Sequence, residues 1–324
     1  MNSASVAVGR DVTRGSIPNL EVRPARSRDE LEAAYRLVHA AYRQQGYLEE
    51  DREGMRLTVY NAFPDTVTFI AKEGREIVGT VSLVADTDVG LPMDEIYGEE
   101  LNDLRSRGRS LAEVTMLANK SQRVSRKMPI FLQLMKQVFD YIWFILQADD
   151  ACLACHPHHS GFYEKRILFE QFGEEKNYHS VQDNPAVALR LNFRTVKERY
   201  REDDRLWRSF FENRTPVRLL ARRHRMTPED LKYFFVTSTD IFREAAPHEI
   251  EALRLLYPEC PWNRWSRAGK YNPVLLAERA CGKLAAAVAR LRRGIVSWVR
   301  PSHPPSPASR PSTTFTPTAE TTMY

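Results

Sequence analysis

A single acidic residue interrupts an apolar run near the middle of the chain. Residues 111–118 (Leu-Ala-Glu-Val-Thr-Met-Leu-Ala) predict a central β-strand that contains Glu113. Burial of a carboxylate disfavours its charged form and raises its pKa. A carboxylate with a raised pKa is suited to act as a general base for an ammonium nucleophile. The alternative is a glutamate that forms a salt bridge on a strand face in contact with solvent.

A phenol occurs at the start of a predicted short helix over residues 160–168. Tyr163 follows Phe162 there, after a short apolar strand predicted at residues 151–156. A phenol in this position could donate a proton to a leaving thiolate. The alternative is an aromatic pair that only packs against the core.

The densest group of soft metal ligands is Cys152-x-x-Cys155-His156-Pro157-His158-His159. Thiolate and imidazole ligands at this density suit zinc. However, Cys152 lies in the predicted strand, where residues three apart face opposite sides. Cys260 and Cys281 stand alone, so no second ligand pair has the spacing of a zinc knuckle. We therefore expect no metal site, and a buried strand that ends in a histidine-rich turn.

Positive charge is concentrated beside the predicted central strand. The chain has 47 Lys and Arg against 42 Asp and Glu, and residues 105–127 hold seven basic residues against Glu113 alone. Four of the seven follow the strand: Lys120, Arg123, Arg126 and Lys127. Such a segment suits a partner with an acidic surface. A second basic cluster at residues 218–225 has no interleaved aromatic residues, so we expect no nucleic-acid binding.

No glycine-rich phosphate loop occurs anywhere in the sequence. A nucleotide pyrophosphate requires bare backbone N–H groups at a helix N-terminus. This argues against a cofactor held through its pyrophosphate. It remains compatible with a phosphopantetheine arm that a carrier protein delivers.

The elements that position these residues alternate between strands and helices. Ser27 is a predicted N-cap, and Glu30 is expected to complete a capping box with it. The predicted order is strand 21–26, helix 28–45, hairpin 66–72 and 76–86, helix 94–107, strand 111–118, buried helix 128–147, strand 151–156, helix 160–168, extended segment 169–174 and strand 186–194. This order predicts an α/β fold, a mixed sheet with helices on both faces.

The sequence divides into four predicted regions. They are a flexible arm (1–18), an α/β domain (19–196), a helical extension (197–299) and a disordered tail rich in Pro, Ser and Thr (300–324). The extension includes helix starts at residues 227 and 247 and a basic amphipathic helix at 273–299. That last helix is a candidate for peripheral contact with an anionic membrane, the alternative being docking on the protein's own core. Few cysteines, no secretory signal and no long apolar run favour a cytoplasmic location, with membrane association through this helix.

The order of strands and helices resembles the GNAT acyltransferase fold. Residues 156–169 are similar to that family's segment P-x-H-x-x-F-Y-x-x-x-L-G-F, although the glycine before Phe169 is missing. The sequence also resembles a narrower branch of this family, at residues 91–97, at Leu104-Arg105 and at Leu111-Ala112-Glu113. That branch is the long-chain N-acyl amino acid synthases, relatives of the acyl-homoserine-lactone (autoinducer) synthases. The resemblance covers about residues 20–195.

The resemblance implies transfer of a long acyl chain from an acyl carrier protein to the amine of a small amino acid. No bound cofactor is implied, because the donor is an acyl-phosphopantetheine thioester. Glu113 would take the proton of the amine, and Tyr163 would protonate the leaving thiolate. Backbone N–H groups near Met116 and Leu117 would stabilise the oxyanion. The acyl tail would enter an apolar cleft beside the central strand, lined by the 128–147 helix.

Binding of the two substrates is assigned to basic residues. The carrier and its pantetheine arm would contact Lys120, Arg123, Arg126 and Lys127. The carboxylate of the amino acid needs a cation, for which Arg36 and Arg43 on the first helix are candidates.

Three other functions remain open at this point. One is a GNAT acetyltransferase that uses acetyl-CoA. Another is a homoserine-lactone synthase, which would also need an S-adenosylmethionine site that the sequence does not reveal. The third is a catalytically silent module that binds a carrier protein or a membrane.

Overall fold

The computed structural model describes residues 20–48, 54–120 and 124–266, apart from the side chains of residues 124–126. The arm predicted at 1–18, the basic helix predicted at 273–299 and the tail predicted at 300–324 lie outside these residues. No helix in the described ranges is both long and apolar enough to cross a membrane.

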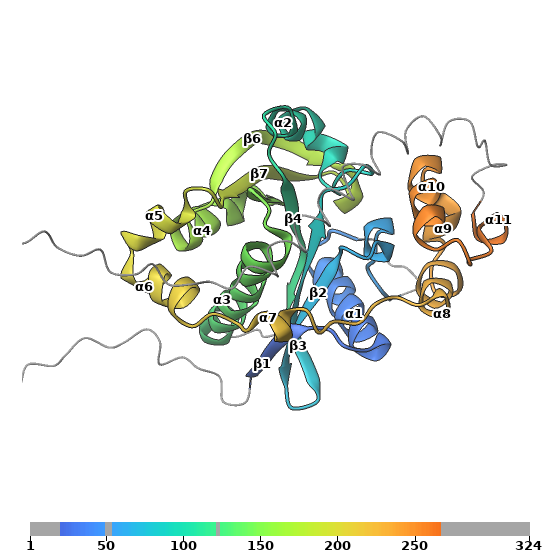
Figure 1. Cartoon of the computed structure of the whole chain (residues 1–324), viewed down its shortest axis with the longest axis horizontal. Coiled ribbons are helices and arrows are strands. Elements are labelled where there is room, and N and C mark those ends of the chain that lie inside the picture. The colour runs from blue at the N-terminus through green and yellow to red at the C-terminus, as the bar shows by residue number, and fades with distance from the viewer. Residues whose placement is uncertain (1–19, 49–53, 121–123, 267–324) are drawn as a thin grey trace, which may run out of the picture. The chain divides into compact units, whose positions relative to one another are not determined.

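A seven-stranded mixed sheet forms the centre of the described chain, with the strand order β1-β2-β3-β4-β5-β7-β6 (Figure 1). The strands are β1 (Leu20–Pro24), β2 (Val67–Glu73), β3 (Glu76–Ala85), β4 (Leu111–Asn119), β5 (Asp150–Cys155), β6 (Glu170–Tyr178) and β7 (Asn184–Asn192). All neighbours are antiparallel except β4 and β5, which are parallel. The mixed sheet predicted from the sequence is confirmed.

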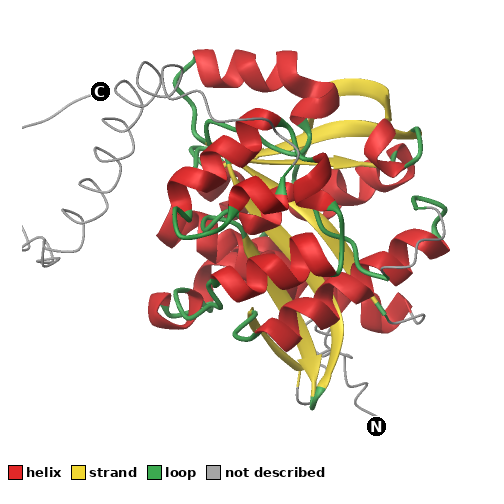
Figure 2. Cartoon of the chain, turned by 90° about the vertical axis from the view of Figure 1, so that its right-hand side faces the viewer, coloured by secondary structure: helices red, strands yellow, loops and turns green. Residues whose placement is uncertain are grey.

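Helices cover both faces of this sheet (Figure 2). Four of them connect one strand to the next along the chain: α1 (Arg28–Gln44), α2 (Asp94–Ser106), α3 (Val124–Tyr141) and α4 (Pro157–Ile167). Buried residues of α3 and α4 share one hydrophobic cluster with the sheet, whereas α1 and α2 pack in other clusters. The side of the sheet under α3 and α4 is called the α3 face below, and the side under α1 and α2 the α1 face.

Helix α1 begins as the sequence predicts, with one difference. The hydroxyl of Ser27 accepts the N–H of Glu30 at 3.2 Å, which confirms the N-cap. The capping box is wrong, because the Glu30 carboxylate accepts the N–H of Arg26 at 2.9 Å instead. It also pairs with Arg23 at 2.7 Å and Lys72 at 2.8 Å. Glu30 therefore ties α1 to β1 and β2.

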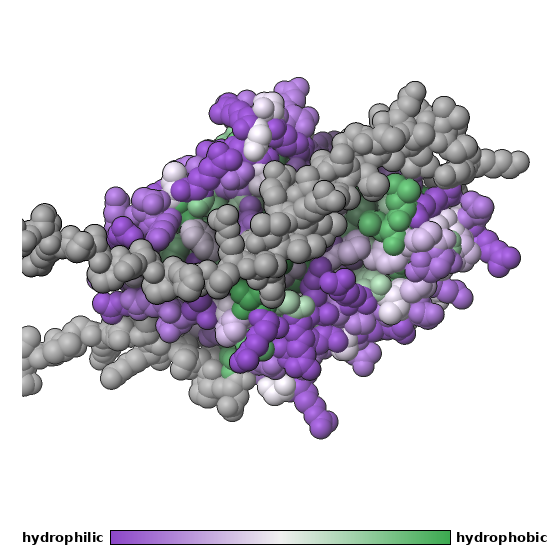
Figure 3. All heavy atoms as spheres, in the orientation of Figure 1, coloured by the Kyte–Doolittle hydropathy of each residue, from purple (hydrophilic) through white to green (hydrophobic). Residues whose placement is uncertain are grey.

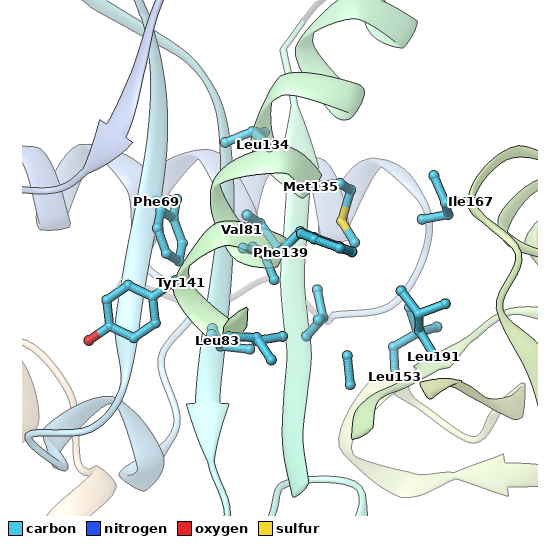
Figure 4. Packing of buried hydrophobic residues seen from close by; sticks show 14 of the residues in the cluster. Phe69, Val81, Leu83, Leu134, Met135, Phe139, Tyr141, Leu153, Ile167 and Leu191 are labelled. Carbon is cyan, nitrogen blue, oxygen red and sulfur yellow. The ribbon is translucent and has the colours of Figure 1, made fainter. Parts of the chain in front are cut away.

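The largest apolar core lies between α3 and the sheet (Figure 4). Phe69 from β2, Leu83 from β3, Phe139 from α3 and Leu191 from β7 all contribute to it. Helix α3 continues into a π-helical segment, η3 (Ile142–Leu146). The prediction of a buried helix over 128–147 is confirmed, with the start four residues earlier than expected.

Short helices follow the sheet. They are α5 (Val196–Arg201), α6 (Asp204–Trp207), η5 (Arg208–Glu212), α7 (Val217–Leu220), α8 (Pro228–Lys232), η6 (Tyr233–Thr237), α9 (Ile241–Glu244), α10 (Pro247–Leu256) and α11 (Trp262–Trp265). The helix starts predicted at 227 and 247 are confirmed. Residues 196–220 join the core of the α3 face. Residues 226–265 pack against α1, where Tyr233 donates to Glu32 at 2.8 Å. The domain boundary at residue 196 stays a prediction.

Candidate active site

Strand β4 diverges from β5 immediately after Glu113. The parallel pairing of the two strands covers only residues 111–113, and its last pair is Glu113 with Cys152. Both strands continue beyond this point, to Asn119 and Cys155. The backbone of β4 beyond Glu113 is therefore open to a ligand on the side of β5.

A β-bulge follows in the same stretch of β4. On its other side, Thr115 pairs with Ser82 and Ala118 with Thr80, so that Met116 and Leu117 both face Val81. The φ angle of Met116 is +53°. Left-handed backbone is uncommon for a residue with a side chain, and such strain is concentrated at functional sites.

The bulge reverses the alternation of side chains along β4. Before it, Ala112 and Val114 lie in the core of the α3 face. After it, Met116 and Ala118 lie against α1, and Leu117 packs on the α3 face. The peptide units at this reversal cannot all join the ladder with β3. The backbone N–H groups of Met116 and Leu117, predicted as oxyanion donors, are located at this bulge.

Glu113 lies on the α1 face, just before the bulge. Its side chain is buried, with 2% of the residue exposed, and Oε2 accepts the N–H of Met93 at 2.8 Å. Burial raises the pKa of this carboxyl to about 8; the Met93 N–H lowers it in part, and Asp94 raises it further. The carboxylate has no ion-pair partner within the part of the chain that the structure describes. The salt-bridge alternative is therefore not what the structure contains.

The turn at residues 91–93 holds Glu113 in place. Tyr60 donates its phenol proton to the carbonyl of Leu91 at 3.3 Å, and Tyr178 donates to that of Pro92 at 3.1 Å. The next N–H along the chain is the one that binds Glu113. Two phenols and one carboxylate from separate elements thus converge on three consecutive residues.

Residues of α2 also stabilise this turn. Asp94 accepts the N–H of Leu91 at 2.7 Å, and Arg105 pairs with Asp94 at 2.6 Å and with Asp86 at 2.8 Å. Gly90 has φ +82°, and a Cβ there would lie 2.6 Å from Oδ2 of Asp94. Glycine is therefore required at this position.

Tyr163, the predicted proton donor, extends from α4. Its ring lies edge-on to Phe131 with centroids 5.8 Å apart. Burial raises the pKa of its phenol well above the usual range, and the nearby Cys155 thiol and Tyr42 phenol raise it further. Tyr163 therefore stays protonated at neutral pH and can donate a proton to a thiolate.

Tyr42 of α1 lies next to the bulge and was missed as a site residue. Burial raises the pKa of its phenol, and the N–H of Met116, which faces the phenol oxygen, lowers it in part. The negative charge of Glu113 acts on the same phenol. No sequence signal places Tyr42 beside Met116 and Glu113, because Tyr42 fits the apolar stripe of α1.

The predicted basic segment is divided by the structure into two groups. Three of its arginines precede β4 and are ion-paired: Arg105 with Asp86 and Asp94, Arg107 with Asp103, and Arg109 with Asp150. Lys120 and Lys127 follow the strand, whose nine residues separate the groups by about 25 Å. The expectation of one uncompensated basic surface over 105–127 is therefore wrong.

The second basic group lies at the bulged end of β4. Lys120 is exposed and pairs with Glu76, and Lys127 is exposed. Arg123 and the side chain of Arg126 lie outside the described residues. Their roles in carrier binding stay predictions.

The two arginines predicted to bind a carboxylate are both on α1. Arg36 pairs with Glu32 of the same helix at 2.8 Å. Arg43 is exposed in the last turn. Arg36 is thus already engaged by a carboxylate, and neither role is tested.

The two cysteines of the Cys-His cluster face opposite sides of the sheet, as predicted. Cys152 is buried on the α1 face, and Cys155 packs on the α3 face. Nδ1 of His156 accepts the N–H of His158 at 3.3 Å and caps α4. Within the described ranges, no three His, Cys, Asp or Glu side chains are placed to hold a metal ion. Cys281 lies outside those ranges.

An apolar pocket lies on the α3 face beside the divergence of β4 and β5. Its lining comes from β4, β5, β7, α3 and the helices after the sheet. The lining residues are Val114, Met135, Val138, Phe139, Ile142, Ala151, Ile167, Phe169, Leu191, Phe193, Tyr200 and Phe210.

Comparisons with known proteins agree with this geometry. The sequence model of the N-acyl amino acid synthase FeeM family matches residues 33–192. The solved structure of FeeM, an N-acyl amino acid synthase from uncultured soil microbes, is 30% identical. It aligns over 55% of this chain and 93% of that chain, with a TM-score of 0.50.

Two acyl-homoserine-lactone synthases are more distant. LasI is 13% identical over 61% of this chain and 96% of its own, with a TM-score of 0.43. The CoA-dependent synthase BjaI is 19% identical over 58% and 88%, with a TM-score of 0.42. No curated protein matches the chain. The GNAT-like core predicted from the sequence is confirmed, and the chain belongs to the N-acyl amino acid synthase FeeM family of acyltransferases.

Proposed function

We propose that this N-acyltransferase moves a long acyl chain from an acyl carrier protein to the amine of an amino acid. The observation that carries the proposal is Glu113, a buried carboxyl with a raised pKa, placed three residues before a strained bulge. That is the arrangement that amine deprotonation beside an oxyanion site requires.

The reaction proceeds in one addition and one elimination. The substrate ammonium gives a proton to Glu113, and the free amine attacks the thioester carbonyl carbon. The carbonyl oxygen becomes an oxyanion and accepts the N–H of Leu117 and, in place of the Tyr42 phenol, the N–H of Met116. Each such donor is worth roughly 3–4 kcal/mol. The C–S bond then breaks, and the sulfur takes the phenol proton of Tyr163.

The protons of the two side chains are restored by exchange with solvent. The attacking nitrogen carries one proton more than the amide product, and it loses that proton as the C–S bond breaks. This proton restores the Tyr163 phenol through solvent, and Glu113 releases the proton it received to solvent. Tyr42 lies against the N–H of Met116 and close to Tyr163. Its phenol is therefore placed to assist in holding the oxyanion or in returning the proton.

A carrier-bound donor is favoured over coenzyme A for two reasons. The sequence has no glycine loop for a pyrophosphate. The basic group of Lys120, Arg123, Arg126 and Lys127 follows the bulged end of β4, where the thioester would enter. Carrier surfaces are acidic, so opposite charges would bring the two proteins together.

A long acyl chain would contact the apolar residues beside the divergence of β4 and β5; the pocket there, of about 10 Å³, has room for one water molecule and must widen to admit the chain. Val114 lines that pocket and is the first residue of β4 beyond the last pair with β5. The described face visible in Figure 3 is mostly hydrophilic, whereas the pocket lining is apolar. An alkyl chain that passes between the diverging strands would leave water on reaching it.

The test is a reaction of the purified protein with a long-chain acyl carrier protein and a mixture of amino acids, read by mass spectrometry. Parallel reactions contain the same acyl group on coenzyme A, or acetyl-CoA. N-acyl amino acids formed fastest from the carrier support the proposal. Products formed only from acetyl-CoA would identify an acetyltransferase. Carrier binding without any product would identify a silent module.

Lipid extraction of bacteria that express the protein gives a second reading. The extract of cells with wild-type protein is compared with that of cells with Glu113→Gln. New N-acyl amino acids in the first extract and not in the second are expected. Equal amounts in both would remove Glu113 from the mechanism.

A further inference from the structure

An enzyme that acylates amino acids needs a cation for the carboxylate of the acceptor, at a fixed distance from its general base. Without one, amines that lack the carboxylate would react equally well. Arg36 is already paired with Glu32. Another arginine, Arg56, is better placed.

Arg56 is half-buried between α1 and the turn that joins β6 to β7. Its backbone N–H donates to the carbonyl of Tyr35 at 3.1 Å. Its Nη2 donates to the carbonyl of Ser180 at 2.9 Å, in the short helix η4 (His179–Val181). Ser180 in turn donates its N–H to Glu95 at 3.2 Å. The backbone of Arg56 is thus tied to α1, and its guanidinium is held at one edge by a single carbonyl of η4.

A short path of contacts leads from this guanidinium to Glu113. Tyr178 precedes Ser180 by two residues, and its phenol donates to the carbonyl of Pro92 at 3.1 Å. The N–H of Met93, in the same peptide unit, donates to Glu113 at 2.8 Å. Arg56 and Glu113 are therefore linked through η4, Tyr178 and the turn at residues 91–93.

The charges of these two groups act on the same phenols. Burial raises the pKa of Tyr178 far above its usual range; the Glu113 carboxylate raises it further, and the Arg56 guanidinium lowers it. The phenol of Tyr42 is affected by both in the same directions. The charges of Arg56 and Glu113 thus both act on the phenols of Tyr42 and Tyr178.

The guanidinium of Arg56 has capacity for a ligand. In residues 20–48, 54–120 and 124–266, no carboxylate forms an ion pair with it. Glu95, the nearest acid on the path described above, binds Ser180 instead. A guanidinium presents five N–H donors, and one hydrogen bond to a carbonyl leaves most of them for another acceptor.

We propose that Arg56 binds the α-carboxylate of the acceptor amino acid and so places its amine at Glu113. The inference rests on the proposed acylation of amino acids and adds the residue that selects them. A guanidinium and a carboxylate form two parallel hydrogen bonds, which fix orientation as well as position. The side chain of the amino acid would then contact the rings of Tyr42 and Tyr178.

The test compares amino acids with amines that differ only by the missing carboxylate. The pairs are tyrosine with tyramine, phenylalanine with phenethylamine, and leucine with isopentylamine. KM and kcat are measured for the wild type, Arg56→Gln, Arg56→Lys and the competing candidate Arg36→Gln. The matched control is Arg243→Gln, whose exposed arginine pairs with Asp240 beside α9. Circular dichroism and Tm are recorded on the same preparations.

We expect Arg56→Gln to raise KM for the amino acids by roughly 10- to 100-fold, the range for a lost hydrogen bond between charged groups. KM for the amines should change by less than about twofold, because they make no such bond. Arg56→Lys should recover part of the loss, and the control Arg243→Gln should behave as the wild type.

The outcomes separate this inference from the proposed function. If the wild type acylates neither member of any pair, the proposed function fails. If it acylates amino acids but Arg56→Gln changes both members of a pair equally with unchanged Tm, Arg56 has no role in carboxylate binding. If Arg36→Gln instead shows the selective loss, the carboxylate binds on α1.

Discussion

Glu113 and Asp140 are both buried, but their surroundings differ. Asp140, on α3, is fully buried and pairs with Lys136 at 2.5 Å and Arg214 at 2.8 Å, and it accepts the N–H of Thr215 at 2.9 Å. Glu113 has one backbone N–H and no cation among the described residues. A buried acid with two cations is held in ion pairs and contributes to structure. A buried acid without one is protonated over an unusual pH range and is available for proton transfer.

The largest expected effect concerns Glu113, the buried acid that has no cation beside it. Glu113→Gln should lower turnover by roughly 10²- to 10⁴-fold, the usual contribution of a general base. The amide can still accept the N–H of Met93, so the fold should persist. Turnover of folded protein is measured beside Tm, and activity should recover partly at high pH, where more of the amine is unprotonated. Normal turnover of the variant would end the proposed mechanism.

For Asp140, the acid held by two cations, we expect that neutralisation lowers the stability of the fold. Asp140→Asn leaves Lys136 and Arg214 with a neutral partner in a buried place, which costs about 3–5 kcal/mol of unfolding free energy. Chemical denaturation measures this cost. Turnover per folded molecule should stay near that of the wild type, because Asp140 lies on α3 and not on β4, which carries Glu113 and the bulge. A large loss of turnover with little loss of stability would reverse the assignment of the two acids.

The pH dependence of stability provides a third test of Glu113. Its pKa is about 8 in the folded protein and about 4.5 when unfolded. Between these values the folded state keeps a proton that the unfolded state has lost, so stability falls as pH rises from about 4.5 to about 8. The full difference amounts to a few kcal/mol at about 1.4 kcal/mol per pKa unit. Glu113→Gln removes this slope and should be the more stable protein above pH 8.

Denaturation of wild type and Glu113→Gln at pH 5, 6.5 and 8 measures this effect. The difference between the two proteins should grow with pH. A constant difference would mean that Glu113 is ionised throughout, and the role of general base would then rest on geometry alone. The same series also separates loss of catalysis from loss of folded protein.

Much of the framework could be predicted from the sequence, because local patterns determine it. The Ser27 cap, the hairpin after residue 66 and the apolar helix before β5 all depend on neighbouring residues. Glu113 could be found because a charge inside an apolar run is a local signal. Tyr163 could be placed because its segment resembles a family motif.

The remaining parts of the site depend on contacts between distant segments. The bulge at Met116 leaves no trace in a run where residues 116–118 are all apolar, so alternation could not reveal it. Arg56 lies in a segment without periodicity and meets Tyr178 only through the folded turn. The pairing of Arg109 with Asp150, 41 residues later, turned an expected docking charge into a structural one.

The smallest expected effect extends the contrast from acids to bases. Charge reversal of Arg123, Arg126 and Lys127 to glutamate should weaken use of the carrier-bound donor severalfold, because opposite charges accelerate association of the two proteins. The matched control is Arg107→Glu, at the other end of β4, where an exposed arginine pairs with Asp103 within its own helix. Surface changes of this kind seldom cost more than about 0.5 kcal/mol of stability, so both variants should fold.

Turnover is measured against carrier concentration at two salt concentrations, since screening should shrink the effect. A loss for the triple variant at low salt, with a normal control, supports docking at the bulged end of β4. An equal loss for Arg107→Glu would mean that overall charge attracts the carrier, and no loss in either would place the docking surface elsewhere.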